Sequence, residues 1–156
     1  TAPERAEAEV KDIERVSREA LKEVREAVSG YRQPTLAAEL QGARRALVAA
    51  GIALELEEGT EPLPPGAEPL LAWTVREGAT NVIRHSRARI CRIRIFRESG
   101  AAGIEIIDDG AGPASDDPGT GLEGLSERVA ARGGRLEAGR LPEGGFRLLV
   151  TVAGGA

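Results

Sequence analysis

The sequence has very few of the residues that build disulfides and metal centres. It contains one cysteine, Cys91, and one histidine, His85. A single cysteine rules out a disulfide within the chain and fits a reducing compartment. One cysteine and one histidine also argue strongly against a structural zinc site. Because Cys91 shares strand parity with Ile93 and Ile95, we expect its thiol to be buried and inert rather than reactive.

Aromatic residues, basic blocks and long apolar runs are scarce as well. With one Trp, one Tyr and two Phe in 156 residues, aliphatic side chains must fill the core. The net charge of −4 and the scattered Lys and Arg argue against a nucleic-acid partner. No apolar run approaches the roughly 18 residues of a membrane span, and no signal peptide opens the chain. We therefore expect a cytoplasmic segment without membrane contact, cut from a longer protein that could carry an anchor elsewhere.

Residues 3–29 are predicted to form one long helix, and the run from Gly30 to Pro34 ends it. This break divides the chain into residues 1–30 and 31–156. The helix carries a narrow apolar stripe at alternating spacings of three and four, made of Val10, Ile13, Ala20, Val24 and Ala27. Such a stripe cannot bury itself alone. Packing against a partner helix or in a dimer is favoured over packing against the chain's own domain.

The rest of the chain alternates between helical and strand patterns. Helices are predicted over 36–50, 68–84 and 122–132, and strands near 52–56, 89–97, 103–108, 136 and 146–152. Consecutive strands joined by short turns indicate a mostly antiparallel sheet with helices on one face. The predicted fold class is α+β, a two-layer α/β sandwich preceded by a long N-terminal helix.

The first of three chemically suggestive motifs runs from Glu77 to His85. On a helical wheel Glu77, Asn81, Arg84 and His85 share one arc of about 100°, opposite the apolar positions. An ordinary solvated surface explains that arc equally well. In the functional alternative, the Asn carboxamide takes a Mg²⁺ position, the Glu orients or deprotonates a nucleophile, and the Arg reaches phosphate.

The second motif is Asp108-Asp109-Gly110-Ala111-Gly112. Asp108 shares parity with Ile104 and Ile106, so it projects on the buried face, where a carboxylate is costly without donors. A capped Asp-Gly turn is one explanation. A hydrogen bond from the exocyclic amine of a flat ring, lying between helix and sheet, explains the burial better. The glycines would let the backbone approach that ring.

The third motif, Gly119-Thr120-Gly121, precedes Leu122 and Leu125 at a predicted helix start. Free amides at a helix N-terminus favour phosphate oxygens, although a flexible surface loop is the commoner reason for such glycines. The polar, proline-flanked residues 113–118 would suit a lid over a nucleotide. The order and separation of the three motifs, more than any one of them, indicate an ATP site.

With these motifs the chain resembles the catalytic ATP-binding domain of bacterial sensor histidine kinases, which belongs to the GHKL ATPase superfamily and has the Bergerat fold. Residues 77–85 resemble the N box, 108–112 the first glycine box and 119–125 the second. The run from Arg76 to Ser86 and the Glu-Val-Arg run at 23–25 are similar to the nitrate-sensor and thermosensor kinases. The aromatic-rich box found between the glycine boxes of many kinases is missing from this sequence.

The resemblance implies a role for individual residues. Asn81 would ligate Mg²⁺, Asp108 would bind the adenine amino group, and Arg84 and His85 would lie near the phosphates. Glu77 stands where related ATPases keep a general base. The other implied ATP contacts are glycines of both boxes, a leucine, and a threonine that would support Asp108 from the last strand: Gly110, Gly112, Gly119, Gly121, Leu122, Gly124 and Thr151.

The function implied is that of a module that binds ATP and Mg²⁺ and donates the γ-phosphoryl group to a histidine. His85 lies inside the nucleotide motif, so the acceptor histidine would come from an absent helix, in cis or in trans. The N-terminal helix would be the second dimerisation helix of a homodimer, and a response regulator would be the next partner. Two alternatives stay open: a serine kinase of the anti-sigma type, which the long N-terminal stripe disfavours, and a nucleotide-sensing dimerisation module without catalysis.

Overall fold

A computed structural model describes residues 1–29, 33–111 and 119–154 of the chain. The chain splits into two compact units, Thr1–Gln33 and Pro34–Ala156. Across these described ranges, no helix combines the length and the apolar character needed to cross a bilayer.

The first unit contains a single helix, α1, from Ala2 to Ser29. Every described side chain of this helix is exposed. The large apolar side chains are 54–70% exposed, and they are Val10, Ile13, Val16, Leu21, Val24 and Val28. Three of these flank the predicted stripe, so the apolar face is wider than the stripe alone. Ion pairs such as Lys11–Glu7 and Arg15–Glu19 occupy the remaining surface of α1.

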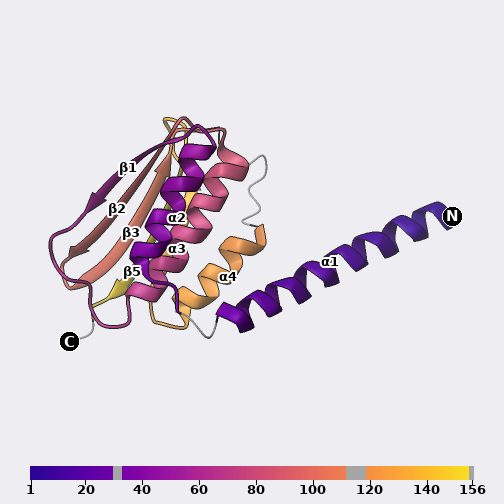
Figure 1. Ribbon diagram of the computed structural model, residues 1–156, viewed down its shortest axis with the longest axis horizontal. Helices are drawn as coiled ribbons and strands as arrows, with labels where there is room; N and C mark the ends of the chain where they lie inside the picture. The colour runs from indigo at the N-terminus through magenta and orange to yellow at the C-terminus, as the bar shows by residue number, and fades with distance from the viewer. Residues whose placement is uncertain (30–32, 112–118, 155–156) are drawn as a thin grey trace. The chain divides into compact units, whose positions relative to one another are not determined.

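The second unit is built on a five-stranded sheet with strand order β1-β2-β3-β5-β4. Its strands are Ala53–Glu58 (β1), Ile90–Glu98 (β2), Ala101–Asp108 (β3), Arg135–Arg140 (β4) and Phe146–Ala153 (β5). Only the β1–β2 pairing is parallel, since a helix connects these two strands. The helices α2, α3 and α4 lie on one face of the sheet (Figure 1). The predicted two-layer α+β fold is confirmed.

Each helix of the second unit begins with a recognisable sequence signal or a glycine. In α2, Leu36–Ala49, the Thr35 hydroxyl accepts a hydrogen bond from the Ala38 amide at 3.3 Å. In α3, Glu68–Asn81, Pro69 stands in the first turn. The helix α4, Gly119–Ala130, starts three residues earlier than predicted, because its first turn takes in both glycines of the third motif.

The helix α3 does not continue regularly to Arg84 as the sequence pattern predicted. It ends at Asn81 and passes into a π-helical turn, η1, over Val82–Ser86. Arg87 follows in the left-handed conformation, with φ of 52°. Single π turns are wider than α-helical ones and occur often at functional sites. The second half of the first motif therefore follows a different path from the predicted wheel.

The core lies between the helices and the inner face of the sheet. Alternate strand residues point inward, among them Ile93, Ile104 and Val150, and they meet fully buried helix residues such as Leu71 and Leu125. Cys91 belongs to this core and is buried. Burial, with a smaller effect of the Asp108 charge, raises the pKa of its thiol to about 12. The predicted burial of Cys91 is confirmed, and the raised pKa fits a thiol that is inert at neutral pH.

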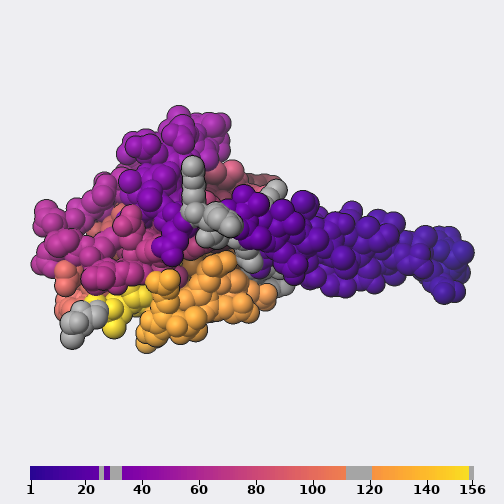
Figure 2. Space-filling view, turned by 60° about the horizontal axis from the view of Figure 1, so that its bottom comes forward, coloured from indigo at the N-terminus to yellow at the C-terminus, as the bar shows by residue number. Residues whose placement is uncertain are grey.

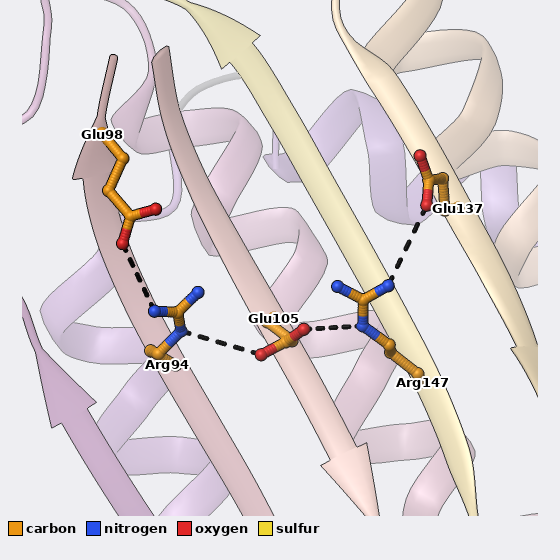
Figure 3. Close-up of polar contacts among 5 residues, drawn as sticks. All are labelled: Arg94, Glu98, Glu105, Glu137 and Arg147. Carbon is orange, nitrogen blue, oxygen red and sulfur yellow. Dashed lines mark hydrogen bonds and ion pairs between the residues drawn. The ribbon is translucent and has the colours of Figure 1, made fainter. Parts of the chain in front are cut away.

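The outer face of the sheet is covered by a ladder of charged side chains (Figure 3). Glu105 on β3 accepts a hydrogen bond from Arg147 on β5 at 2.6 Å and pairs with Arg94 on β2 at 3.7 Å. Arg94 also pairs with Glu98, and Arg147 also pairs with Glu137 on β4. These five charged side chains pair with one another on the face of the sheet that the helices leave open.

Candidate functional site

A small cleft, with room for little more than a water molecule as the side chains stand, lies between the C-terminal half of α3 and the inner face of β3 and β5. It is lined mainly by apolar side chains, with one carboxamide and one carboxylate among them: Gly78, Asn81, Val82, Ile106, Asp108, Phe146 and Leu148. Asn81 comes from the first sequence motif and Asp108 from the second. The fold therefore brings these two motifs to one cleft.

Gly78 allows α3 to lie close to the sheet at this point. A Cβ atom there would overlap the side chain of Ile106 on β3 and come within 3.5 Å of Leu148 on β5. The close approach leaves little space between α3 and β3 at this point. Sequence analysis did not single out Gly78, since its role depends on which strand faces the helix.

Asp108 ends β3 with its carboxylate at the inner side of the sheet, and only 5% of the residue is exposed. Its Oδ1 accepts a hydrogen bond from the Gly110 amide at 2.9 Å. Burial raises the pKa of Asp108, the Gly110 bond lowers it, and the neighbouring charge of Asp109 raises it. Within the described residues no hydrogen bond reaches Oδ2. The carboxylate thus retains acceptor capacity in an apolar setting.

The adjacent acid, Asp109, has a different task. Its Oδ1 accepts hydrogen bonds from the backbone amides of Arg89 at 2.8 Å and Ile90 at 2.9 Å. Those two bonds lower the pKa of Asp109. Asp109 therefore fastens the start of β2 to the end of β3 and faces solvent, whereas Asp108 faces the cleft.

The loop after Asp108 packs against the end of the π turn. A Cβ atom at Gly110 would overlap the Ser86 carbonyl, and that carbonyl accepts a hydrogen bond from Ala111 at 2.7 Å. The Ser86 hydroxyl donates to Val82 at 2.6 Å and accepts from Ala88 at 3.0 Å. Gly110 therefore allows a close approach to the backbone of η1, whereas its motif predicted an approach to the ring of a ligand.

Gly145 supports the other side of Asp108. Its φ is 94°, and a Cβ atom there would overlap the Asp108 carbonyl oxygen. Sequence analysis gave Gly145 no role in the site. Ser86 and Gly145 are thus supporting residues that sequence analysis missed, since each acts on a residue far away in the chain.

The third motif approaches the first through Glu77. This residue is half-buried on α3, and a Cβ atom at Gly121 would lie 2.6 Å from its Oε2. Gly119 and Gly121 stand in the first turn of α4, whose first amides have no partner within the helix. Leu122 is 6% exposed and belongs to the core, and Gly124 follows it on α4. Gly112 and the proposed lid at 113–118 lie outside the described residues.

Arg84 and His85 are exposed on the π turn and do not line the cleft. The position predicted for Thr151 is wrong. Thr151 pairs with Gly103 and Arg135 on the outer face of the sheet, whereas Asp108 pairs with Phe146 on the inner face. Because side chains alternate along a strand, Thr151 points away from Asp108. Along β5 it lies five residues after Phe146, the residue that pairs with Asp108.

The cleft offers few side chains that could bind a metal ion, so a bound ligand would have to supply most of the coordinating oxygens. In the part of the chain that the structure describes, no group of three or more His, Cys, Asp or Glu side chains could hold a metal. Asn81 offers a carboxamide oxygen at the cleft, and nothing among the described residues hydrogen-bonds to its side chain. One protein oxygen, with phosphate oxygens and waters, matches the way Mg²⁺ is usually held with a nucleotide.

Sequence comparison finds sensor histidine kinases among the relatives of the chain, while no family model matches it. The chain is 38% identical over 130 residues to sensor histidine kinase YvfT of Bacillus subtilis, a match that covers 81% of this chain and 35% of YvfT. It is 32% identical over 155 residues to sensor histidine kinase DesK of the same organism, covering 96% of this chain and 41% of DesK. The chain thus spans well under half the length of these relatives.

Solved structures share the fold at lower identity. The histidine kinase AdeS of Acinetobacter baumannii superposes with a TM-score of 0.64 at 18% identity, covering 78% of this chain and 66% of that one. The catalytic domain of histidine kinase ThkA superposes with a TM-score of 0.61 at 12% identity, covering 77% and 94% of the two chains.

Proposed function

We propose that this chain, a homologue of the catalytic region of the sensor histidine kinases, binds Mg²⁺-ATP and donates the γ-phosphoryl group to a histidine on another segment. The observation that carries the proposal is the shared cleft of Asp108 and Asn81. The Asp108 carboxylate can accept a hydrogen bond from the amino group of a flat base, and the Asn81 carboxamide oxygen can bind a metal ion that also binds a phosphate chain. The two come from elements far apart in the sequence.

In the proposed complex the adenine ring lies between α3 and the sheet. Leu148 and Phe146 on the sheet side of the cleft offer apolar surface to one face of the ring, and the Asp108 carboxylate accepts a hydrogen bond from its exocyclic amine. Such a charged acceptor in an apolar setting gives strong discrimination, because a base without that amine leaves the carboxylate buried and unpaired.

The phosphate chain would extend from this base toward the C-terminal end of α3. The Asn81 oxygen holds the bound Mg²⁺, which supplies positive charge against the phosphate oxygens during transfer. The first amides of α4, at Gly119 and Gly121, offer further donors for phosphate oxygens. Arg84 and His85 are exposed beyond Asn81 and would reach the phosphates from the solvent side.

Transfer would follow an in-line path. A nitrogen of the acceptor imidazole attacks the γ-phosphorus, a nitrogen–phosphorus bond forms, and the bond to the oxygen of the departing ADP breaks. Glu77 lies beside the start of α4 and would orient the imidazole or take its proton. His85 belongs to the nucleotide motif, so the acceptor comes from a segment outside this chain or from a partner chain.

The helix α1 fits the proposal as the second dimerisation helix of a sensor kinase. Its wide apolar face is exposed in the chain by itself, so it has surface available for a four-helix assembly of two subunits. In the whole protein we propose a homodimer, with a response regulator as the next acceptor of the phosphoryl group.

The binding part of the proposal is tested by calorimetry with ATP, with and without Mg²⁺. The wild type should bind Mg²⁺-ATP more tightly than ATP alone. Asn81→Ala should remove most of that Mg²⁺-dependent gain while leaving metal-free ATP affinity nearly unchanged. Equal affinities of the wild type with and without Mg²⁺ would contradict the metal role of Asn81, and absence of ATP binding would contradict the function itself.

The transfer part is tested with radiolabelled ATP. The chain alone should gain no acid-labile, alkali-stable label. A supplied helix that carries a phosphoacceptor histidine, taken from a homologous kinase, should gain such label when mixed with it. A module that only senses nucleotide would bind ATP normally and label neither component.

A further inference from the structure

We propose that Trp73 is a positioning residue for the phosphate-binding first turn of α4, an inference that rests on the function proposed above. Trp73 is half-buried on α3 and lies outside the cleft, so it does not touch the ligand in the proposed complex. It acts through a group of four side chains from three helices, here named the Trp73 cluster: Glu39, Trp73, Arg76 and Arg128.

The cluster is built around two guanidinium groups over one indole ring. Arg76 of α3 lies 4.8 Å from the ring centroid, and Arg128 of α4 lies 4.4 Å from it. Each contact is an attraction between a cation and the negative face of the ring. Because Arg128 belongs to α4 and Trp73 to α3, the indole holds the two helices together.

Glu39 of α2 supplies a negative charge that partly neutralises the positive charge of the two arginines. Its carboxylate forms a two-point bond with Arg76, from Nε at 3.2 Å and from a terminal nitrogen at 2.5 Å. The Glu39 side chain is 17% exposed and the Arg76 side chain is 41% exposed, so solvent reaches the pair mainly from the Arg76 side. The pair orients Arg76 and offsets its repulsion of Arg128.

Helical geometry connects this cluster with the cleft. Trp73 and Glu77 are four residues apart on α3, and Gly121 and Arg128 are seven residues apart on α4, so each pair shares a helix face. The same faces that meet at Trp73 and Arg128 therefore meet again at Glu77 and Gly121. A change in how α4 rests on Trp73 moves its first turn relative to Glu77.

The far end of α4 is fastened independently. Arg132 donates a hydrogen bond to the Gly66 carbonyl at 2.7 Å, next to the start of α3. In the space-filling view α4, in orange, is a continuous part of the surface of its unit (Figure 2). Core packing by Leu122, Leu125 and Val129 fixes α4 on the sheet, and the Trp73 cluster adds a lateral contact between α4 and α3.

The test compares Trp73→Leu with Phe96→Leu, a matched control. Arg94 lies over Phe96 at 4.7 Å on the outer sheet face, so the control removes the same kind of contact far from α4. Amide hydrogen exchange of the ligand-free protein should speed up over residues 119–130 in Trp73→Leu and stay at the wild-type rate in the control. This measurement needs no nucleotide, so it decides whether Trp73 holds α4 even if the proposed function fails.

Ligand affinity then separates positioning from general weakening. In Trp73→Leu we expect about tenfold weaker binding of Mg²⁺-ATP, because a tenfold change in affinity corresponds to the free energy of one or two cation–π contacts. The binding of adenosine, which lacks phosphates, should stay unchanged. Trp73→Phe should recover much of the loss, because the smaller ring still offers a face to the two guanidinium groups. Wild-type exchange over 119–130, or an equal loss for adenosine and Mg²⁺-ATP, would overturn the proposal.

Discussion

At the scale of single residues, the two neighbouring acids at the end of β3 differ in burial and therefore in the direction in which their pKa values shift. Asp108 is buried at the cleft, and its pKa is raised mainly by that burial. Asp109 is exposed, and hydrogen bonds from two backbone amides lower its pKa. Asp108 in its charged form therefore lowers stability in exchange for an acceptor at the proposed adenine site, whereas Asp109 raises stability by joining two strands.

We predict that Asp108→Asn will weaken ATP binding at least tenfold while leaving the melting temperature at neutral pH equal or higher. The carboxamide can still accept the Gly110 hydrogen bond, but it removes the charge that burial penalises. Because the folded pKa of Asp108 is raised, the folded protein holds that proton more tightly. The wild type therefore loses stability as pH rises from about 3.9, the unfolded value, through the folded pKa.

The stability gained by Asp108→Asn over the wild type should accordingly grow with pH in the acid range and level off near neutrality. Asp109→Asn provides a control of opposite sign. The lowered pKa of Asp109 means that its contribution is present above the unfolded pKa and disappears as pH falls. Thermal unfolding from pH 3 to pH 7 measures both. Parallel curves for the two variants would contradict this account.

At the scale of elements, the crossing of η1 with the loop after β3 fixes the end of the cleft. We predict that Gly110→Ala will lower the free energy of unfolding by about 2 kcal/mol or more and will also weaken ATP binding. The new methyl group would overlap the Ser86 carbonyl, a backbone atom that cannot turn aside as a side chain could.

Gly42→Ala is the matched control for this substitution. Gly42 lies inside α2, and no atom comes within 4 Å of a Cβ placed there. Alanine should therefore raise stability by roughly 0.5–1 kcal/mol through helix propensity. Chemical denaturation followed by circular dichroism measures both variants. Equal effects of the two would show that the crossing tolerates a side chain.

The charged ladder on the outer face gives a second prediction for an element. Glu105 is 16% exposed and joins Arg94 and Arg147, so Glu105→Gln would leave two arginines facing a neutral group. We expect a loss of about 1 kcal/mol in unfolding free energy, reduced at high salt. ATP affinity should stay at the wild-type value, because the ladder is on the opposite face from the cleft. A loss that salt does not change would mean packing rather than charge is at work.

At the scale of the whole molecule, the two units make separate contributions. We predict that residues 34–156 alone will keep the melting temperature and bind ATP within about twofold of the full chain, because the described side chains of α1 are all exposed and add no core. The full chain should self-associate in sedimentation experiments, and the shortened one should not. Val24→Glu on α1 should abolish association without changing ATP affinity. Association of residues 34–156 would refute the role given to α1.

Strand and helix periodicity by itself determined much of this protein. Alternation along the strands predicted that Cys91 and Asp108 would lie on the inner face, and the sequence pattern predicted α2, α3, α4 and the strands β1 to β5, but not the π turn η1. Those patterns are local, because the face on which a side chain lies follows from its position in the repeat of its own helix or strand. The same parity rule, applied to Thr151, would have placed it on the outer face.

Only the tertiary structure decided which distant segments touch. The contacts of Gly78 with Ile106, Gly145 with Asp108 and Gly110 with Ser86 depend on how the layers pack, and so do the π turn and the guanidinium groups gathered over Trp73. At these three glycines the packing leaves room for the Cα hydrogen but not for the methyl group of an alanine. That fit is a property of two surfaces brought together, and no single stretch of sequence contains it.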